Sequence, residues 1–192
     1  MATKTPSSQE LKKKKKKWIS ILASSEFNNY EIGETIVDEP EHAIGRRIEV
    51  NLMMLTKDPK KQNFNVYFDI VDVKNNQALT KLVAYKIQLA QLKRITRSGK
   101  NKLDDSFVYN SKDGKKITIK PIFITKTLTY KTTLKEIRKA VRKFLTNYTK
   151  NTNSSQIMKD VIDNHLQKEM KNAVKKVTPV INSTVKMALL ED

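Results

Sequence analysis

FNVYFDIVDVKNNQALTKLVAYKI, residues 64–87, carries the clearest strand pattern of the chain. Every second residue over 64–70 is apolar, which is the period of a strand with one face buried. Residues 74–77 are turn formers, and residues 78–87 return with the β-branched and aromatic residues that favour a strand. The stretch therefore predicts an antiparallel β-hairpin with two long arms.

Further strands are expected on both sides of this hairpin. Asp113-Gly114 is a strong hairpin signal between two apolar runs, and Pro121 places the second of those runs at a sheet edge or a bulge. Residues 24–34 are expected to be irregular, with Gly33 as a breaker. The expected strands outside the first hairpin are residues 18–23, 46–52, 106–110, 115–124 and 180–190.

After Thr125 the apolar period changes from 2 to 3.6, which indicates helices. Thr133 and Glu136 are spaced as a capping box, and a second helix is expected to start at Ser154 or Ser155. Residues 89–97 form a short basic helix or loop. The predicted fold class is α+β, with a mostly antiparallel, β-barrel-like core of six or seven strands followed by two packed helices.

The charge of the chain is strongly positive. The 192 residues include 38 Lys and Arg against 20 Asp and Glu, a formal net charge of +18. Residues 12–17 are six consecutive lysines, which repel one another and are not buried without a polyanion. We expect a disordered basic tail over 1–17 and a single α+β domain over 18–192. Nucleic acid is the expected partner, and the excess of lysine over arginine favours contact with phosphates over bidentate base recognition.

Catalytic and cofactor signals are weak. The chain has no cysteine, which excludes disulfides, thiolate metal sites and cysteine nucleophiles. His42 is interpreted as an exposed surface residue and His165 as a half-buried structural one. No cofactor and no metal are expected, and no signal peptide or membrane-spanning run is recognised. An RNA-processing or RNA-modifying enzyme is the alternative, but it would need a clustered acidic or histidine site, and none is visible.

The candidate RNA-binding residues are cations in three clusters and one pair. A solvated helix face is the plainer interpretation of residues 135–143, and a flexible loop is the plainer interpretation of residues 93–102. For residues 12–17 the alternatives are a nuclear localisation signal or a patch for anionic lipid. Phosphate contact is favoured for all three. Arg46 and Arg47 are the pair and lie at a strand start. Because side chains alternate along a strand, one of the two is expected to point inward and at most one to be free to bind phosphate. Tyr67, Tyr85 and Tyr109 are expected to pack rather than to stack on bases. The candidates are Lys12, Lys13, Lys14, Lys15, Lys16 and Lys17; Arg46 and Arg47; Lys93, Arg94, Arg97, Lys100 and Lys102; and Lys135, Arg138, Lys139, Arg142 and Lys143.

Several blocks of sequence, in order, resemble an archaeal and eukaryotic small-subunit ribosomal protein family, usually called S-three-a or eukaryotic-type S-one. The blocks are Lys16-Lys17-Trp18 to Phe27, Ile32-Gly33-Glu34-Thr35, Ile44-Gly45-Arg46 to Leu52, Leu55-Thr56-x-Asp58, Lys112-Asp113-Gly114, Lys120-Pro121-Ile122-x-Ile124-Thr125 and Ile137-Arg138-Lys139. The resemblance covers roughly Lys12 to Lys176, and the short chain is similar to archaeal members. The chain departs from the family at Gln88-Leu89-Ala90 and after Thr178-Pro179-Val180, where its end carries less positive charge.

The resemblance implies a non-catalytic protein of cytoplasmic ribosomes. It implies a β-barrel-like core with helices packed around it. It also implies a place on the platform of the small subunit, near the messenger exit and the 3′ end of the small-subunit ribosomal RNA. The implied partners are that RNA and neighbouring ribosomal proteins, with messenger RNA as a further candidate.

Overall fold

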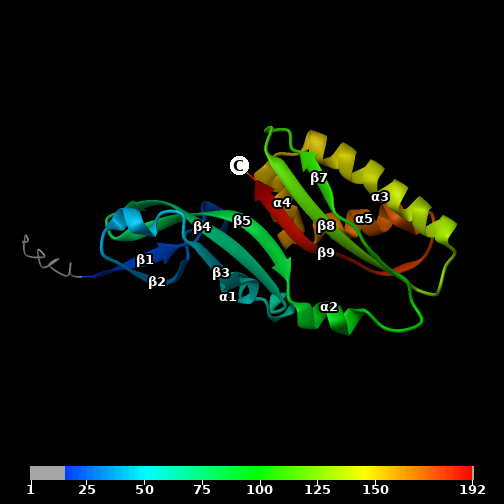
Figure 1. Cartoon of the computed structure of the whole chain (residues 1–192), viewed down its shortest axis with the longest axis horizontal. Coiled ribbons are helices and arrows are strands. Elements are labelled where there is room, and N and C mark those ends of the chain that lie inside the picture. The colour runs from blue at the N-terminus through cyan, green and yellow to red at the C-terminus, as the bar shows by residue number, and fades with distance from the viewer. Residues whose placement is uncertain (1–15, 192) are drawn as a thin grey trace, which may run out of the picture.

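The computed structural model describes residues 16–191 (Figure 1). An α+β architecture is confirmed: a nine-stranded sheet is combined with five α-helices in this part of the chain. The strands are β1 (Lys17–Leu22), β2 (Glu31–Val37), β3 (Arg47–Asn51), β4 (Phe64–Lys74), β5 (Gln77–Ile87), β6 (Lys102–Asp104), β7 (Phe107–Asn110), β8 (Lys116–Thr125) and β9 (Val180–Glu191). The helices are α1 (Leu52–Thr56), α2 (Leu89–Ile95), α3 (Lys131–Asn151), α4 (Ser154–Ile162) and α5 (His165–Lys175), with 3-10 turns η1 (Ser25–Phe27), η2 (Pro40–Ala43) and η3 (Pro59–Lys61).

The strand order along the sheet is β2-β1-β5-β9-β8-β6, with β3 and β4 continuing from β5, and β7 paired to β8. Only the β1–β5 pair is parallel among the described pairs. Strands β1 to β4 lie at one end of an elongated molecule, and α3, α4 and α5 lie at the other (Figure 1). β5 and β9 pair where the two ends meet, so the ladder runs through the whole protein.

The predicted hairpin over residues 64–87 is confirmed as β4 and β5. Asn75 and Asn76 form its turn with φ angles of 50° and 61°, a left-handed conformation that asparagine tolerates better than most residues. Lys74 pairs with Gln77 across this two-residue turn. The predicted second hairpin is confirmed as β7 and β8, where Gly114 adopts φ +76°.

The sheet differs from the predicted barrel of six or seven strands, because it stays open and has nine strands over the described residues. One strand that was missed is β2, in a stretch expected to be irregular up to residue 34, which pairs antiparallel with β1. Gly33 and the two acids, Glu31 and Glu34, interrupt the apolar pattern of this strand, which is stabilised by its pairing with β1. The side chain of Arg46, just before β3, reaches β2 and donates to Thr35 Oγ1 at 2.7 Å and to the Ile36 carbonyl at 3.1 Å. In a closed barrel, β2 and β3 would be joined by backbone hydrogen bonds. Here the side chain of Arg46 connects them instead.

The position of β9 in the sheet differs from the predicted layout, in which the helices follow the strands. A final strand over residues 180–190 was expected and is present, but it inserts between β8 and β5 in the middle of the sheet. Its pairing with β8 extends over nearly the whole of both strands, from Thr125 and Val180 to Lys116 and Glu191. The chain therefore returns to its own core after the three helices.

The helical region has three helices after β8 where two were expected. α3 begins at Lys131 with Tyr130 as its N-cap, so Thr133 lies inside the helix and does not form the predicted capping box. The expected second helix divides into α4 and α5 at Asn164, which adopts φ 60°. A continuous apolar stripe hid this break, because both helices keep their apolar faces on the same core.

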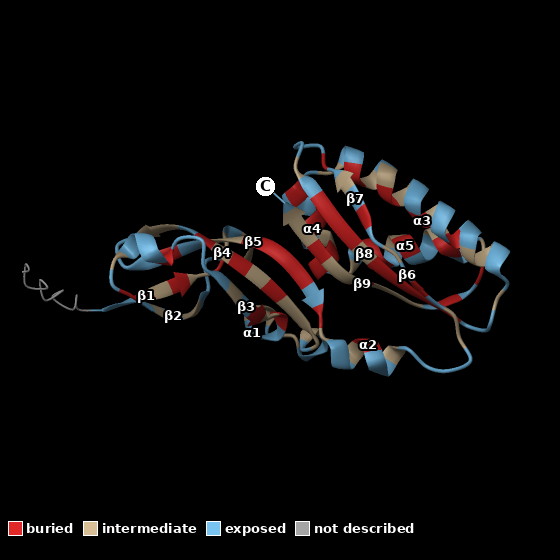
Figure 2. Ribbon diagram, in the orientation of Figure 1, coloured by how far each residue is buried: buried red, intermediate tan, exposed pale blue. Residues whose placement is uncertain are grey.

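Three buried apolar clusters stabilise the fold (Figure 2). The largest lies between the sheet and α3, α4 and α5; a second lies among β1, β2 and β4; and a third joins α2 to β8. The register of β8 shifts between Lys120 and Pro121, so the bulge expected at Pro121 is confirmed. The alternation of side chains along β8 continues through the shift, so Ile119 faces the helices while Ile122 and Ile124 face α2. One strand therefore carries apolar cores on both of its faces.

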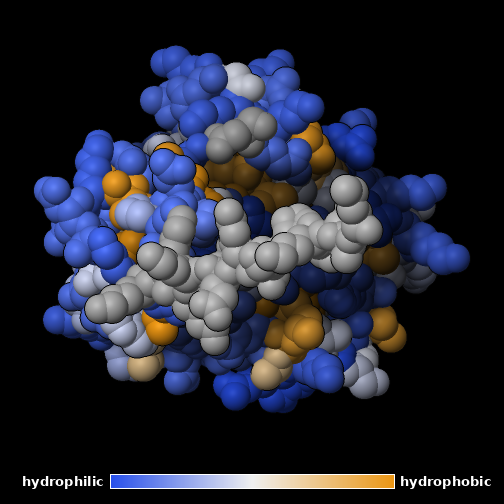
Figure 3. Space-filling model, turned by 60° about the vertical axis from the view of Figure 1, so that its left-hand side comes forward, coloured by the Kyte–Doolittle hydropathy of each residue, from blue (hydrophilic) through white to orange (hydrophobic). Residues whose placement is uncertain are grey.

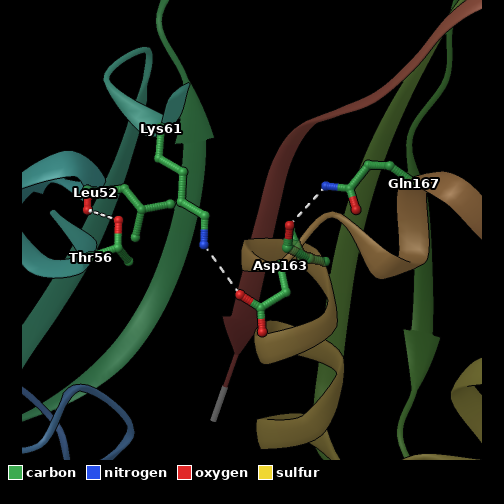
Figure 4. Close-up of polar contacts among 6 residues, drawn as sticks. Leu52, Thr56, Lys61, Asp163 and Gln167 are labelled. Carbon is green, nitrogen blue, oxygen red and sulfur yellow. Dashed lines mark hydrogen bonds and ion pairs between the residues drawn. The ribbon is translucent and has the colours of Figure 1, made fainter. Parts of the chain in front are cut away.

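An ion pair links the two ends of the molecule across the sheet (Figure 4). Lys61 of η3 lies 3.2 Å from Asp163, at the turn between α4 and α5. The same turn is fixed by Gln167, whose Nε2 donates to the Val161 carbonyl at 2.8 Å. Asp163 is largely exposed, so this pair contributes at most about 1 kcal/mol and serves mainly to orient η3 against the helices.

Candidate nucleic-acid interface

The outer face of α3 carries an uninterrupted line of lysines. Ile137, Val141 and Leu145 are buried against the core, so this helix has one face fixed inward. Lys135, Lys139 and Lys143 are exposed, and no ion pair to them is found among the described residues. Three like charges at successive i,i+4 positions repel one another, and a phosphate chain would relieve that repulsion.

The two arginines of α3 have partners that the sequence did not reveal. Arg138 Nε lies 3.0 Å from Asp105, which precedes β7. The guanidinium of Arg142 lies 5.5 Å from the centroid of the Phe107 ring, at cation–π distance. These two contacts anchor α3 to the sheet. Both arginines are nevertheless exposed, so they still face solvent. The partner of Arg138 was missed because it lies 33 residues away in the sequence.

Arg46 and Arg47 are both exposed and both engaged within the protein. Arg47 forms a bidentate pair with Asp69, at 2.7 Å and 2.8 Å, and this contact raises the pKa of the guanidinium. Arg46 bridges to β2 as described above. The expectation that one side chain points inward is wrong, because β3 begins only at Arg47 and Arg46 lies in the preceding turn.

The cations around α2 form a second exposed group. Lys93, Arg94 and Arg97 are exposed, and Lys100 is half-buried. Lys102 instead pairs with Asp104 at 3.2 Å, so its charge is partly neutralised. The helix was one of the two interpretations offered for this segment, and its apolar Leu92 anchors it in the third core cluster.

The lysine run lies only partly within the described residues. Lys16 and Lys17 are exposed, and β1 starts at Lys17. Lys12 to Lys15, and with them the prediction of a disordered tail, lie outside the described part of the chain. β1 and α3 lie toward opposite ends of the molecule, so the predicted residues do not form one patch (Figure 1). Viewed toward the β1 end, the surface is mostly hydrophilic with scattered apolar patches (Figure 3).

The tyrosines and histidines offer no clear catalytic site. Tyr85 is buried and stacks on Phe64, and burial raises its pKa. Tyr148 donates a hydrogen bond to Asp160; burial first, and then this carboxylate, raises the pKa of the phenol. His165 is exposed and 3.7 Å from Glu169, so the half-buried interpretation is wrong. Over residues 16–191 no group of three metal-ligating side chains occurs, and no helix is long and apolar enough to cross a membrane.

Glu26 of η1 occupies a pocket between the two ends of the sheet, where Lys81, Lys115 and Ser154 also lie. Burial raises the pKa of its carboxyl group, and the nearby Lys159 offsets only part of the rise. The folded-state pKa thus lies above the unfolded value. Ionisation of Glu26 therefore opposes folding, and its effect grows as pH rises from about 4 through the folded-state pKa.

Glu26→Gln is expected to raise the melting temperature at pH 7, because the amide carries no charge to desolvate. Below about pH 4 glutamate is protonated in both states, and the variant and the parent should melt together. Thermal melting at both pH values tests this, with the exposed Glu41→Gln as the control. A lower melting temperature for Glu26→Gln at pH 7 would show that the carboxylate is stabilised by its lysine neighbours.

Comparison with known proteins identifies the family of this chain. A model of the Ribosomal S3Ae family matches residues 7–191. The chain belongs to the Ribosomal S3Ae family. Relatives named small ribosomal subunit protein eS1 include one from Nanoarchaeum equitans, 29% identical over 93% of this chain and 90% of its own length. Others come from Methanobrevibacter smithii, 28% identical over 87% and 86%, and Halorubrum lacusprofundi, 31% identical over 66% and 59%. The family resemblance expected from the sequence blocks is confirmed.

Proposed function

We propose that this protein is a structural constituent of the small ribosomal subunit and binds small-subunit ribosomal RNA. The observation that carries the proposal is the family match over residues 7–191, together with relatives named as small ribosomal subunit proteins. The net charge of +18 supports it, because such a charge strains the free protein and is relieved by bound phosphate. Its role is architectural and involves no catalysis.

The finer placement follows from the family resemblance. We infer a seat on the platform of the subunit, near the messenger exit and the 3′ end of the ribosomal RNA, in cytoplasmic ribosomes. Neighbouring small-subunit proteins are the second class of partner, and messenger RNA is a third. This inference agrees with an elongated molecule (Figure 1) in which the exposed Lys16 and Lys17 and the exposed lysines of α3 lie toward opposite ends.

RNA contact is assigned to the exposed cations. The α3 lysines and the cations around α2 are presented by a rigid α+β domain over 18–192. The basic tail over 1–17 would enter an RNA cleft, and its charge would be neutralised there. Arg46, Arg47 and Arg138 combine an exposed position with intramolecular ion pairs or hydrogen bonds, so they would contact phosphate through their remaining donors.

The chain is expected to sediment with small subunits after a high-salt wash of lysed cells. Its affinity for purified RNA should fall steeply with salt, with a log–log slope of about 0.7 per phosphate neutralised on single strands. Gradient sedimentation and a salt titration of binding measure the two quantities. A protein that stays at the top of the gradient would contradict the ribosomal role, and a slope near one would contradict binding through several clusters.

A further inference from the structure

Two hollows adjoin at the start of β9. The first, about 290 Å³, is lined by Arg94, Arg97 and Lys100 from the α2 side. The second, about 260 Å³, is lined by Lys168 and Lys171 of α5. Both are lined by Ile181 and Asn182, so the two hollows lie on either side of these β9 residues, one toward α2 and the other toward α5. We call this surface the β9 groove: cations stand on both sides of a floor made by the first residues of β9.

The groove carries positive charge without a counter-charge. Five cations line it, and neither hollow is lined by an acidic residue. Glu169 of α5 is engaged by His165, and Asp163 by Lys61. Lys171 donates to the Ile181 carbonyl at 2.9 Å, which positions its ammonium group over the floor and leaves two further donors.

The floor offers polar groups that lack partners. β9 pairs with β5 only over residues 187–189, so the edge of 181–186 that faces away from β8 has no strand beside it in the described fold. Gln167 is 4% exposed, and its Oε1 accepts no hydrogen bond. Ser183 Oγ is likewise buried without a partner. Both residues line the second hollow. Both atoms are shielded from solvent as they stand, so a ligand's donor reaches them only when the side chains turn toward the hollow, and the cost of leaving them unpaired favours that turn.

We propose that the β9 groove binds one strand of RNA along its sugar–phosphate backbone. Phosphates would lie against the cations from α2 and α5, and ribose 2′-hydroxyl groups would face the polar wall at Gln167 and Ser183. No aromatic side chain lines either hollow, so the contact follows the backbone and not the base sequence. The 2′-hydroxyl is both a donor and an acceptor, and it distinguishes RNA from DNA.

This inference rests on the proposed function and extends it to a surface that charge patterns did not reveal. Lys168 and Lys171 belong to a group of four lysines over residues 168–176 that was not among the predicted clusters. The fold brings them to the same groove as Arg94 and Arg97, which lie more than seventy positions earlier. The β9 backbone is the common floor.

The first experiment is lysine footprinting of the purified full chain with an amine-acetylating reagent, with and without a 12-nucleotide oligouridylate. The expected result is joint protection of Lys100, Lys168 and Lys171, while the hairpin lysines Lys112 and Lys116 keep their reactivity. An oligoglutamate of equal charge is the competing ligand. Equal protection by oligoglutamate, or no protection by RNA, would overturn the proposal.

The second experiment measures affinity at about 0.15 M salt, where each phosphate contact on a single strand contributes about three- to four-fold. Lys168→Gln with Lys171→Gln should weaken oligouridylate binding about ten-fold, as should Arg94→Gln with Arg97→Gln. The control, Lys112→Gln with Lys116→Gln, should change it less than about two-fold. Removing Lys171 also removes its hydrogen bond to the Ile181 carbonyl and could lower the melting temperature of the lysine variant. In that case the arginine variant still tests the proposal, because it keeps this hydrogen bond.

Oligodeoxyuridylate completes the design, because it lacks the 2′-hydroxyl. Weaker binding of this ligand by the parent protein, with the difference lost in Ser183→Ala, supports the ribose contact; equal binding of the two ligands overturns it. The groove variants could bind RNA normally while the parent protein still sediments with small subunits. This result would refute RNA binding in the β9 groove and leave the proposed function standing. A parent protein that neither binds RNA nor sediments with subunits would refute the proposed function itself.

Discussion

Replacing Phe68 with alanine is expected to lower the free energy of unfolding by about 3–5 kcal/mol. Phe68 is 0% exposed in the largest core cluster, and its ring lies 5.7 Å from that of Phe27 in an edge-on arrangement. It is paired between Ile48 of β3 and Leu82 of β5, so its neighbours are held by the sheet and cannot collapse into the space it leaves. The cavity that remains accounts for the upper part of the range.

Val71→Ala is the matched control on the same strand. Val71 is 55% exposed, so its removal should cost less than about 1 kcal/mol. Denaturant unfolding of both variants, followed by circular dichroism, gives the two free energies. Equal losses would mean that the inward and outward faces of β4 have been assigned wrongly.

Neutralising the α3 lysines should have the largest effect on RNA binding. Lys135→Gln, Lys139→Gln and Lys143→Gln together remove three phosphate contacts, which predicts a loss of affinity of about fifty-fold at 0.15 M salt. The salt slope should fall by about two. The melting temperature should stay the same or rise slightly, because repulsion along the helix is relieved. Arg138 and Arg142 are left in place because they contact Asp105 and Phe107.

A control of the same charge separates this surface from general electrostatics. Lys57→Gln, Lys60→Gln and Lys86→Gln remove three exposed lysines that lie outside α3. Salt-dependent binding and incorporation into small subunits should be measured for both triple variants. Equal losses would indicate that only total charge matters, and unchanged incorporation of the α3 variant would make its lysines a solvated surface.

Features set by neighbouring residues could be predicted from the sequence. The two hairpins, the α3 stripe and the bulge at Pro121 each depend on a short pattern whose physical cause is local. β2 was missed because it depends on β1 for its pairing. The break at Asn164 was missed because the apolar stripe passes through it, and the open sheet was missed because closure depends on edges far apart in the sequence.

In the candidate site, too, local features could be predicted from the sequence, whereas contacts between distant residues could not. Exposure of the α3 cations follows from their periodicity and is confirmed, whereas the segment around α2 has no such pattern and its Lys100 is half-buried. Their partners do not follow from it: Asp105 and Asp69 approach Arg138 and Arg47 only after the chain has folded. Lys168 and Lys171 are spaced for one face of a helix but were not predicted, and only the folded structure shows that they lie beside β9.

The central place of β9 has a consequence for synthesis of the protein. β1 to β8 leave the exit tunnel before β9, yet β5 and β8 are joined through β9. Until β9 arrives, both strands present unpaired backbone edges, which are sites for association with other nascent chains. Loop closure over the three helices must precede the final pairing, so this step is non-local and slow. A chain that stalls before residue 180 would therefore be a substrate for chaperones and proteases, which delays its delivery to the growing subunit.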